Sequence, residues 1–159
     1  MRFSYIPGQA LSGVLTYSEE EYSFRFDVDS VDDLAARIGH AGQASVLIGS
    51  LQLEVAARSG EVLFVWGLHP RVRWVEGRVS APPTESGNVR LDADFSPGVS
   101  ISLVPIGEWI TAFDPRTGWL RVTDDQNLDD HLVVEVASGI LLGERLGVLS
   151  SIWLHPRID

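Results

Sequence analysis

The chain contains no cysteine, which excludes disulfides, thiolate nucleophiles, zinc–thiolate sites and iron–sulfur clusters. It also contains no lysine: all 12 basic residues are arginines, so no lysine is available for a Schiff base or a phosphate-binding P-loop. No apolar run approaches the roughly 20 residues that span a bilayer. Residues 1–21 lack the continuous apolar stretch of a signal peptide. We therefore expect a cytoplasmic protein that does not interact with membranes.

Recognisable catalytic motifs are missing as well. There is no G-x-S-x-G nucleophile elbow, and the glycines of residues 139–147 have the spacing of hairpin turns, not of a dinucleotide-binding loop. The four histidines show none of the H-x-H, H-x-x-x-H or H-E-x-x-H spacings of metal sites. We expect no cofactor and no metal, and we favour a protein that is not an enzyme.

The hydrophobic patterning is typical of β-strands. With 159 residues, 45% of them hydrophobic, the chain is long enough for one domain, residues 1–159, with a proper core. Apolar and polar residues alternate with period two in residues 22–28, 50–56 and 88–95, as in half-buried antiparallel strands. Residues 61–66 and 132–136 are almost continuously apolar, which favours central strands. Residues 58–61 and 142–147 have the composition of tight hairpin turns.

Weaker signals complete the expected fold. Helix signals occur at residues 30–39, with Ser30 as N-cap and Asp33 three positions later, and in a shorter segment, residues 105–113. The sequence therefore predicts an α+β domain: a mainly antiparallel sheet of about nine strands with one or two short helices. Further strands are expected at residues 12–17, 71–79, 100–104, 118–123 and 148–154.

The charge is strongly one-sided. There are 22 acidic residues against 12 basic ones, a formal net charge of −10. Such a chain repels nucleic acid and anionic membranes and associates faster with a basic partner. The acids gather in residues 18–33, which include Glu19 and Glu20, and in residues 123–131. The second stretch holds four aspartates: Asp124, Asp125, Asp129 and Asp130.

Three interpretations of residues 123–131 remain open. The segment is a solvated turn, a docking surface for a basic partner, or a metal-binding loop. It lacks the central glycine and terminal glutamate of a calcium-binding EF-hand loop, which weighs against the metal. No zinc-type spacing involves its histidine, His131.

The tetrapeptide Leu-His-Pro-Arg occurs twice, in residues 68–71 and 154–157. Proline has no amide hydrogen and pushes the preceding residue into extended geometry, so a His-Pro pair ends a strand cleanly. In that interpretation His69 and His155 are partly exposed strand ends. The alternative is a ligand site at the mouth of a polar pocket, which requires the two strand ends to meet. That site would comprise His69, Arg71, His155 and Arg157.

Five tryptophans are available for packing or binding. Trp66, Trp74 and Trp153 fall in strand-like segments, and we expect them in the core. Trp109 and Trp119 flank the turn near residues 113–118, and we expect them to be partly exposed aromatic anchors.

The order of features in residues 30–114 resembles one branch of the bacterial polymorphic-toxin immunity proteins. The shared elements are the helix "SVDDLAARIG", the hairpin "LQLEVAARSGEVLFV" and the segment "DADFSPGVSISLVPIGEWITAF". The resemblance covers about half of the chain. It implies a small acidic protein that neutralises a cognate toxin by occlusion and performs no chemistry.

The leading hypothesis is therefore a non-enzymatic binding protein, an acidic immunity protein whose partner is a basic toxin domain such as a nuclease. The alternatives are a small-molecule-binding protein or enzyme with a polar pocket near His69 and His155, and a structural or assembly subunit. The expected partner-binding residues are Glu19, Glu20, Trp109, Trp119, Asp124, Asp125, Asp129 and Asp130.

Overall fold

A computed structural model describes residues 1–124, 126 and 128–159 of the chain. The described part is mostly β: one α-helix, one 3-10 turn and fifteen strands, where the sequence predicted about nine strands in an α+β fold. The helix is α1 (Val31–Ile38) and the 3-10 turn is η1 (Arg71–Arg73). The strands are β1 (Arg2–Pro7), β2 (Gly13–Ser18), β3 (Ser23–Val28), β4 (Gln43–Ile48), β5 (Leu51–Ala56), β6 (Val62–Leu68), β7 (Val75–Glu76), β8 (Glu85–Asp92), β9 (Ser100–Val104), β10 (Trp109–Phe113), β11 (Leu120–Asp124), β12 (Leu132–Ala137), β13 (Ile140–Arg145), β14 (Val148–Leu154) and β15 (Arg157–Ile158).

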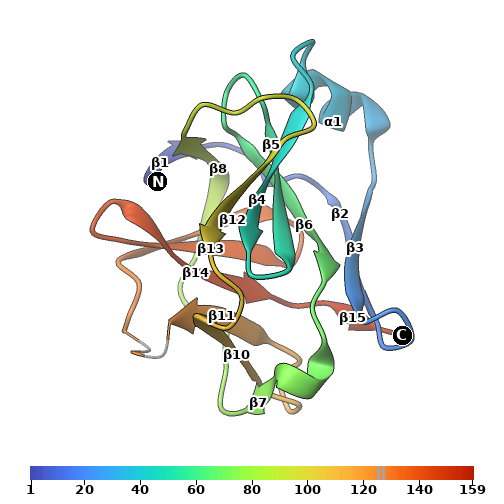
Figure 1. Cartoon of the computed structure of the whole chain (residues 1–159), viewed down its shortest axis with the longest axis vertical. Helices are drawn as coiled ribbons and strands as arrows, with labels where there is room; N and C mark the ends of the chain where they lie inside the picture. Colours follow the sequence, from blue (N-terminus) through green and yellow to red (C-terminus); the bar gives the residue numbers. More distant parts are fainter. Residues whose placement is uncertain (125, 127) are drawn as a thin grey trace.

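The strands form two sheets (Figure 1). One has the order β1-β8-β12-β13-β14-β11-β10-β7, and a further pairing joins β1 to β14. The other has the order β15-β2-β3-β6-β5-β4-β9. Most neighbouring strands are antiparallel, as predicted. Parallel pairings in the described part of the chain join β8 to β12, β7 to β10, β2 to β15 and β4 to β9.

The main core draws on both sheets, and period-two alternation supplies its residues. In β3, Phe24 and Phe26 are buried while Arg25 between them is exposed. In β8, Val89 and Leu91 are likewise buried while Arg90 between them is exposed. Successive side chains of a strand point to opposite faces, so each such strand contributes every second residue to one continuous hydrophobic cluster.

A second, smaller hydrophobic cluster lies on the other face of the eight-stranded sheet. Ile152 and Leu154 of β14 belong to the main core, so Trp153 between them points away from it. Leu141 of β13 and Val133 of β12 face the same way, and Val79 packs on them from the segment after β7. Two of the cavities described below open on this outer face, next to Trp153.

The helix is confirmed where it was predicted. The Ser30 hydroxyl accepts a hydrogen bond from the backbone N–H of Asp33 at 3.1 Å, and Gly39 ends the helix with a positive φ of 69°. No residue of α1 is fully buried, although Leu34 packs against the core. The helix is therefore a peripheral element.

Two segments differ from the prediction. Residues 105–113 do not form a helix: Pro105 begins a turn, Gly107 has a φ of 89°, and β10 follows and pairs with β11 along its whole length. The β-branched Ile110 and Thr111 suit that strand better than a helix. Residues 71–79 are not one long strand either, because η1 precedes the two-residue strand β7.

Both Leu-His-Pro-Arg copies end a strand. Leu68 is the last residue of β6 and Leu154 the last of β14, and each His-Pro pair lies outside the ladder. The structures that follow the two copies differ: the first copy leads into η1 and the second into β15. The predicted role of His-Pro as a strand terminator is confirmed, and the tetrapeptide marks no common structure beyond it.

Candidate functional site

The acidic segment, residues 124–130, connects β11 to β12. Asp124 ends β11 opposite Trp109 of β10 and is exposed, as is Asp129. Asp125 lies outside the described residues. The predicted aromatic anchor Trp109 therefore lies beside one of the predicted acidic residues.

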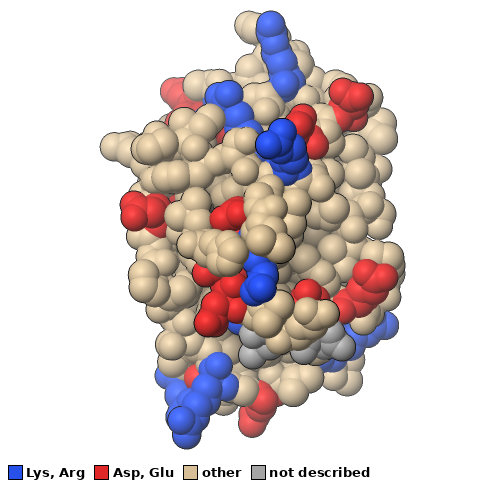
Figure 2. Space-filling view, turned by 90° about the vertical axis from the view of Figure 1, so that its left-hand side faces the viewer, with Lys and Arg blue, Asp and Glu red and all other residues tan. Residues whose placement is uncertain are grey.

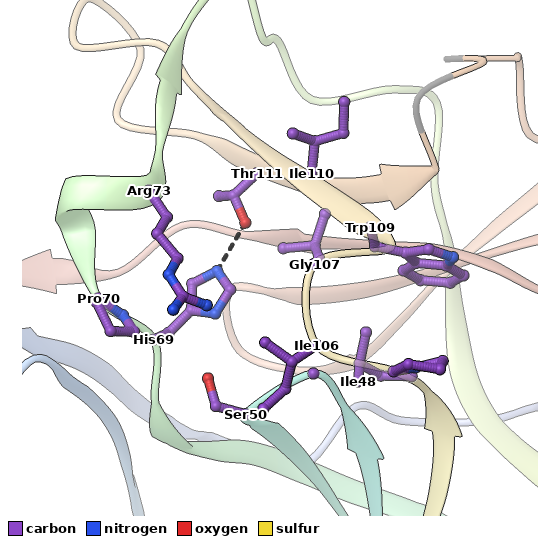
Figure 3. A pocket seen from close by; sticks show the side chains of 13 residues that line it. Ile48, Ser50, His69, Pro70, Arg73, Ile106, Gly107, Trp109, Ile110 and Thr111 are labelled. Carbon is purple, nitrogen blue, oxygen red and sulfur yellow. Dashed lines mark hydrogen bonds between the residues drawn. The ribbon is translucent and has the colours of Figure 1, made fainter.

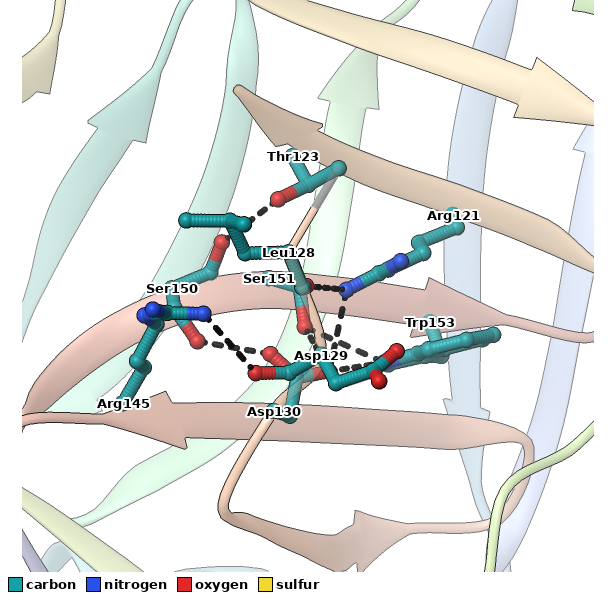
Figure 4. Close-up of polar contacts among 9 residues, drawn as sticks. All are labelled: Arg121, Thr123, Leu128, Asp129, Asp130, Arg145, Ser150, Ser151 and Trp153. Carbon is teal, nitrogen blue, oxygen red and sulfur yellow. Dashed lines mark hydrogen bonds and ion pairs between the residues drawn. The ribbon is translucent and has the colours of Figure 1, made fainter. Parts of the chain in front are cut away.

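Asp130 is a structural residue, which corrects its predicted role in partner binding. Its side chain is only 3% exposed, and it accepts hydrogen bonds from the hydroxyls of Ser150 and Ser151, both at 2.7 Å (Figure 4). Trp153 Nε1 donates to the same carboxylate at 3.1 Å and Arg121 Nη2 at 3.4 Å. A carboxylate enclosed by these donors is not free to meet a partner. Its position instead holds the end of the acidic segment against β11 and β14.

Arg121 and Trp153 form the centre of a concave outer surface. The Arg121 guanidinium lies over the Trp153 ring, 4.7 Å from its centroid, and donates to the backbone carbonyl of Leu128 at 2.7 Å. Two adjoining cavities, of about 600 and 430 Å³, both include these two side chains in their lining. We call the two cavities together the outer-face groove.

Residues from two segments line the larger cavity: Pro82 to Glu85 before and at the start of β8, and Asp129 to Val133 before and at the start of β12. The smaller cavity lies between the segment after β7 and the strands β10 and β11, and it reaches Asp124.

Asp114 holds the segment after β7 in place as a wall of the groove. Its side chain, 3% exposed, accepts hydrogen bonds from the backbone N–H of Val79 at 3.0 Å and from Arg116. These hydrogen bonds, that from the Arg116 side chain foremost, lower the pKa of Asp114 to about 2. The Thr117 hydroxyl donates to the carbonyl of Val79. The N–H and the carbonyl of Val79 are therefore both hydrogen-bonded to the turn after β10.

The exposed charges that line the groove are mainly negative. Glu85, Asp124 and Asp129 are exposed carboxylates, and Arg78 is the exposed arginine among the lining residues. The wider surface is mixed: on the face shown in Figure 2, carboxylates lie in several separate groups with arginines between them. The charge of the groove is therefore local and does not belong to a continuous acidic face.

The other acidic stretch lies elsewhere. Glu19 and Glu20 occupy the β2–β3 turn, and Glu19 forms an ion pair with Arg71 of η1. In Figure 1 this blue turn is near the C-terminus at the right, whereas β11, which ends in Asp124, is toward the lower left. The two predicted acidic regions thus do not join into one docking surface.

The remaining tryptophans also find separate positions. Trp119 is half-buried against the outer cluster and stacks on His155, with ring centroids 4.7 Å apart. Trp109 is half-buried against the main core. Trp153 is buried as expected, whereas Trp66, 37% exposed, is not a core residue.

His69 lies in an aromatic environment at the end of β6. Its Nε2 and the hydroxyl of Thr111 are 2.7 Å apart, and its ring lies near Phe24 and Trp74. Burial, helped by the positive charge of Arg73, lowers its pKa from 6.5 to about 4. The imidazole is therefore neutral at pH 7.

The two Leu-His-Pro-Arg copies do not build one site. His155 is exposed, with its Nε2 3.2 Å from the carbonyl of Thr117, and it does not line the cavity that contains His69. Arg71 packs over the rings of Trp74 and Phe113, and Arg157 is exposed on β15. The hypothesis of a shared pocket with both histidines at its mouth is not supported.

Neither a group of metal ligands nor a long apolar helix occurs in the described part of the chain. No three of its His, Asp or Glu side chains are grouped closely enough to hold a metal ion. None of its helices has the length and apolarity needed to cross a bilayer.

No protein-family model matches the chain, and no curated protein matches its sequence. The resemblance to immunity proteins stays a prediction.

Sequence reasoning missed the residues that shape the groove. Arg121 and Trp153 belong to apolar strand segments, and nothing in their spacing indicates that they stack on each other. The only available signal was the acidic segment, which borders the groove through Asp124 and Asp129.

Proposed function

We propose that this protein is a non-enzymatic binding protein that neutralises a basic protein, such as a toxin nuclease domain, by covering its surface. The observation that carries the proposal is the outer-face groove, with the exposed carboxylates of Glu85, Asp124 and Asp129 around it in a chain of net charge −10. A partner surface rich in lysine or arginine has the complementary charge.

The shape of the groove suits a protruding segment of the partner. Trp153 and Arg121 are fixed at its base by the Asp130 hydrogen bonds, and Pro82 and Pro83 limit the freedom of one wall. A preformed surface loses little conformational entropy on binding, which favours affinity. The exposed acids act mainly on the rate of association, because charges at a rim steer the encounter.

The proposal is tested by co-expression with the product of the gene directly upstream. If that product is a basic toxin domain, this protein should restore growth, and the purified pair should bind with a rate constant that falls steeply with salt. An upstream product that is not toxic, or toxicity that this protein does not relieve, would contradict the proposal.

A charge-reversal pair locates the interface. Asp124→Lys with Asp129→Lys should lower the association rate by about ten-fold at low salt. The control, Asp29→Lys with Asp94→Lys, changes the net charge equally at exposed acids that do not line the groove, and it should have a much smaller effect. Equal effects of the two pairs would place the interface elsewhere.

A further inference from the structure

A third cavity, of about 230 Å³, lies beside His69 and shares only Ile110 and Thr111 with the lining of the outer-face groove (Figure 3). It is formed by the end of β6 and η1 on one side, the β4–β5 turn on another, and β10 with the turn before it on a third. Its volume corresponds to roughly eight water molecules, so it admits a molecule with about that many non-hydrogen atoms.

One part of the cavity is apolar. Ile48 comes from the end of β4, and Ile106, Trp109 and Ile110 come from β10 and the preceding turn. Ile106 is 66% exposed, so its apolar side chain is accessible to a ligand. The apolar part favours a ligand with a compact hydrocarbon body.

The other part of the cavity is polar and carries one positive charge. Arg73 lines it, and no hydrogen bond or ion pair joins its guanidinium to the described residues. Figure 3 shows its side chain directed toward the His69 ring. The positive charge of Arg73 also contributes, after burial, to the lowered pKa of His69. An arginine without a partner at a cavity wall is suited to bind a carboxylate through two parallel N–H···O bonds.

His69 and Thr111 supply directional hydrogen bonding. His69 Nε2 and the buried Thr111 hydroxyl already share one hydrogen bond, whereas Nδ1 has no partner among the described residues. The neutral ring has one N–H to donate, and when Thr111 donates to Nε2 that N–H is at Nδ1. Ser50 adds a hydroxyl at the opposite wall.

We infer that this cavity binds a small monocarboxylic acid with a compact apolar body, its carboxylate on Arg73 and its hydrocarbon part against Ile106 and Trp109. A cationic ligand is disfavoured by Arg73. A metal ion would find one histidine and no carboxylate among the lining residues. A dianion such as phosphate would face one arginine and several aliphatic side chains that cannot replace its hydration.

Benzoate is the probe, and benzamide, its neutral analogue of nearly the same shape, is the control ligand. Calorimetry and tryptophan fluorescence should report benzoate binding, with benzamide at least ten-fold weaker. Arg73→Gln should weaken benzoate by roughly 10- to 100-fold. Arg157→Gln removes one exposed charge that does not line the cavity and should leave binding unchanged.

An NMR titration provides an independent readout of the site. A carboxylate bound beside His69 favours the protonated ring, so saturating benzoate should raise the pKa of His69 from about 4. The inference is overturned if benzoate does not bind, if benzamide binds equally well, if Arg73→Gln binds benzoate like the unchanged protein, or if the pKa of His69 does not move.

Discussion

Replacing Asp130 with alanine should be among the most destabilising changes in this protein. The carboxylate is 3% exposed and joins β14 to β11 by accepting from Ser150, Ser151, Trp153 and Arg121. Asp130→Ala removes the acceptor from Ser151, which is fully buried, and the partner charge from Arg121, whose side chain is 10% exposed. Breaking a buried ion pair by removing one partner costs about 3–5 kcal/mol. That is a large share of the roughly 5–15 kcal/mol by which domains are stable.

Two further variants separate the charge from the hydrogen bonds. Asp130→Asn keeps one oxygen to accept from Ser151 and Trp153, and its amide can donate to Ser150, so we expect a loss of about 1–2 kcal/mol. Asp129→Ala changes the adjacent exposed acid and should cost less than about 0.5 kcal/mol.

The assay is urea unfolding at pH 7, followed by tryptophan fluorescence and by circular dichroism. The dependence of the free energy of unfolding on urea concentration is compared between the three variants and the unchanged protein. If Asp130→Ala does not fold, the asparagine variant still gives a measurable value. A free energy of unfolding for Asp130→Ala within about 0.5 kcal/mol of the unchanged protein would refute the reasoning, because the buried network would then contribute nothing.

Two other predictions concern close packing and pH. A Cβ at Gly143 would lie 2.5 Å from Cγ of Asp130, so Gly143→Ala should lower the free energy of unfolding in urea by about 2 kcal/mol. In the control Gly77→Ala the new Cβ would have its nearest neighbour at 3.9 Å, and the free energy of unfolding should change little. Equal effects of the two substitutions would contradict the close packing of Gly143 against Asp130. Because His69 has a folded pKa of about 4 against an ordinary 6.5, the unfolded chain takes up its proton first, and stability should fall by on the order of 2–3 kcal/mol between pH 6.5 and 4. His69→Gln should remove that part of the pH dependence in unfolding curves at several pH values, and an unchanged dependence would contradict the burial of a neutral ring.

Much of the β-structure was predictable because it depends on local patterns. The strands at residues 100–104 and 148–154 were predicted at their observed bounds, and those at 50–56 and 132–136 within one residue. The helix was predictable because its cap residues act within one turn of chain. The conformation of residues 105–113 was not predictable from the sequence. It depends on the positive φ of Gly107 and on pairing with β11, which lies further along the chain.

The candidate sites were harder to predict than the fold. Proximity in the sequence made Asp124, Asp129 and Asp130 look equivalent, yet Asp130 alone is buried, because Ser150, Ser151 and Trp153 from β14 surround it. The repeated tetrapeptide predicted Arg71 as a ligand-binding residue, whereas Arg73, two residues later, lines the cavity beside His69. Neither outcome has a local signal.

The sequence by itself determined the mainly antiparallel pairing of strands, the helix at residues 31–38, the strand ends at the two His-Pro pairs and the excess of negative charge. These follow from composition and from the conformational limits of single residues and short periods. Only the tertiary structure decided which acids stay exposed, that Arg121 stacks on Trp153, and that Arg73 and Thr111 meet His69. Those contacts join strands that are distant in the chain, and their register is set by the packing of both sheets on a shared core.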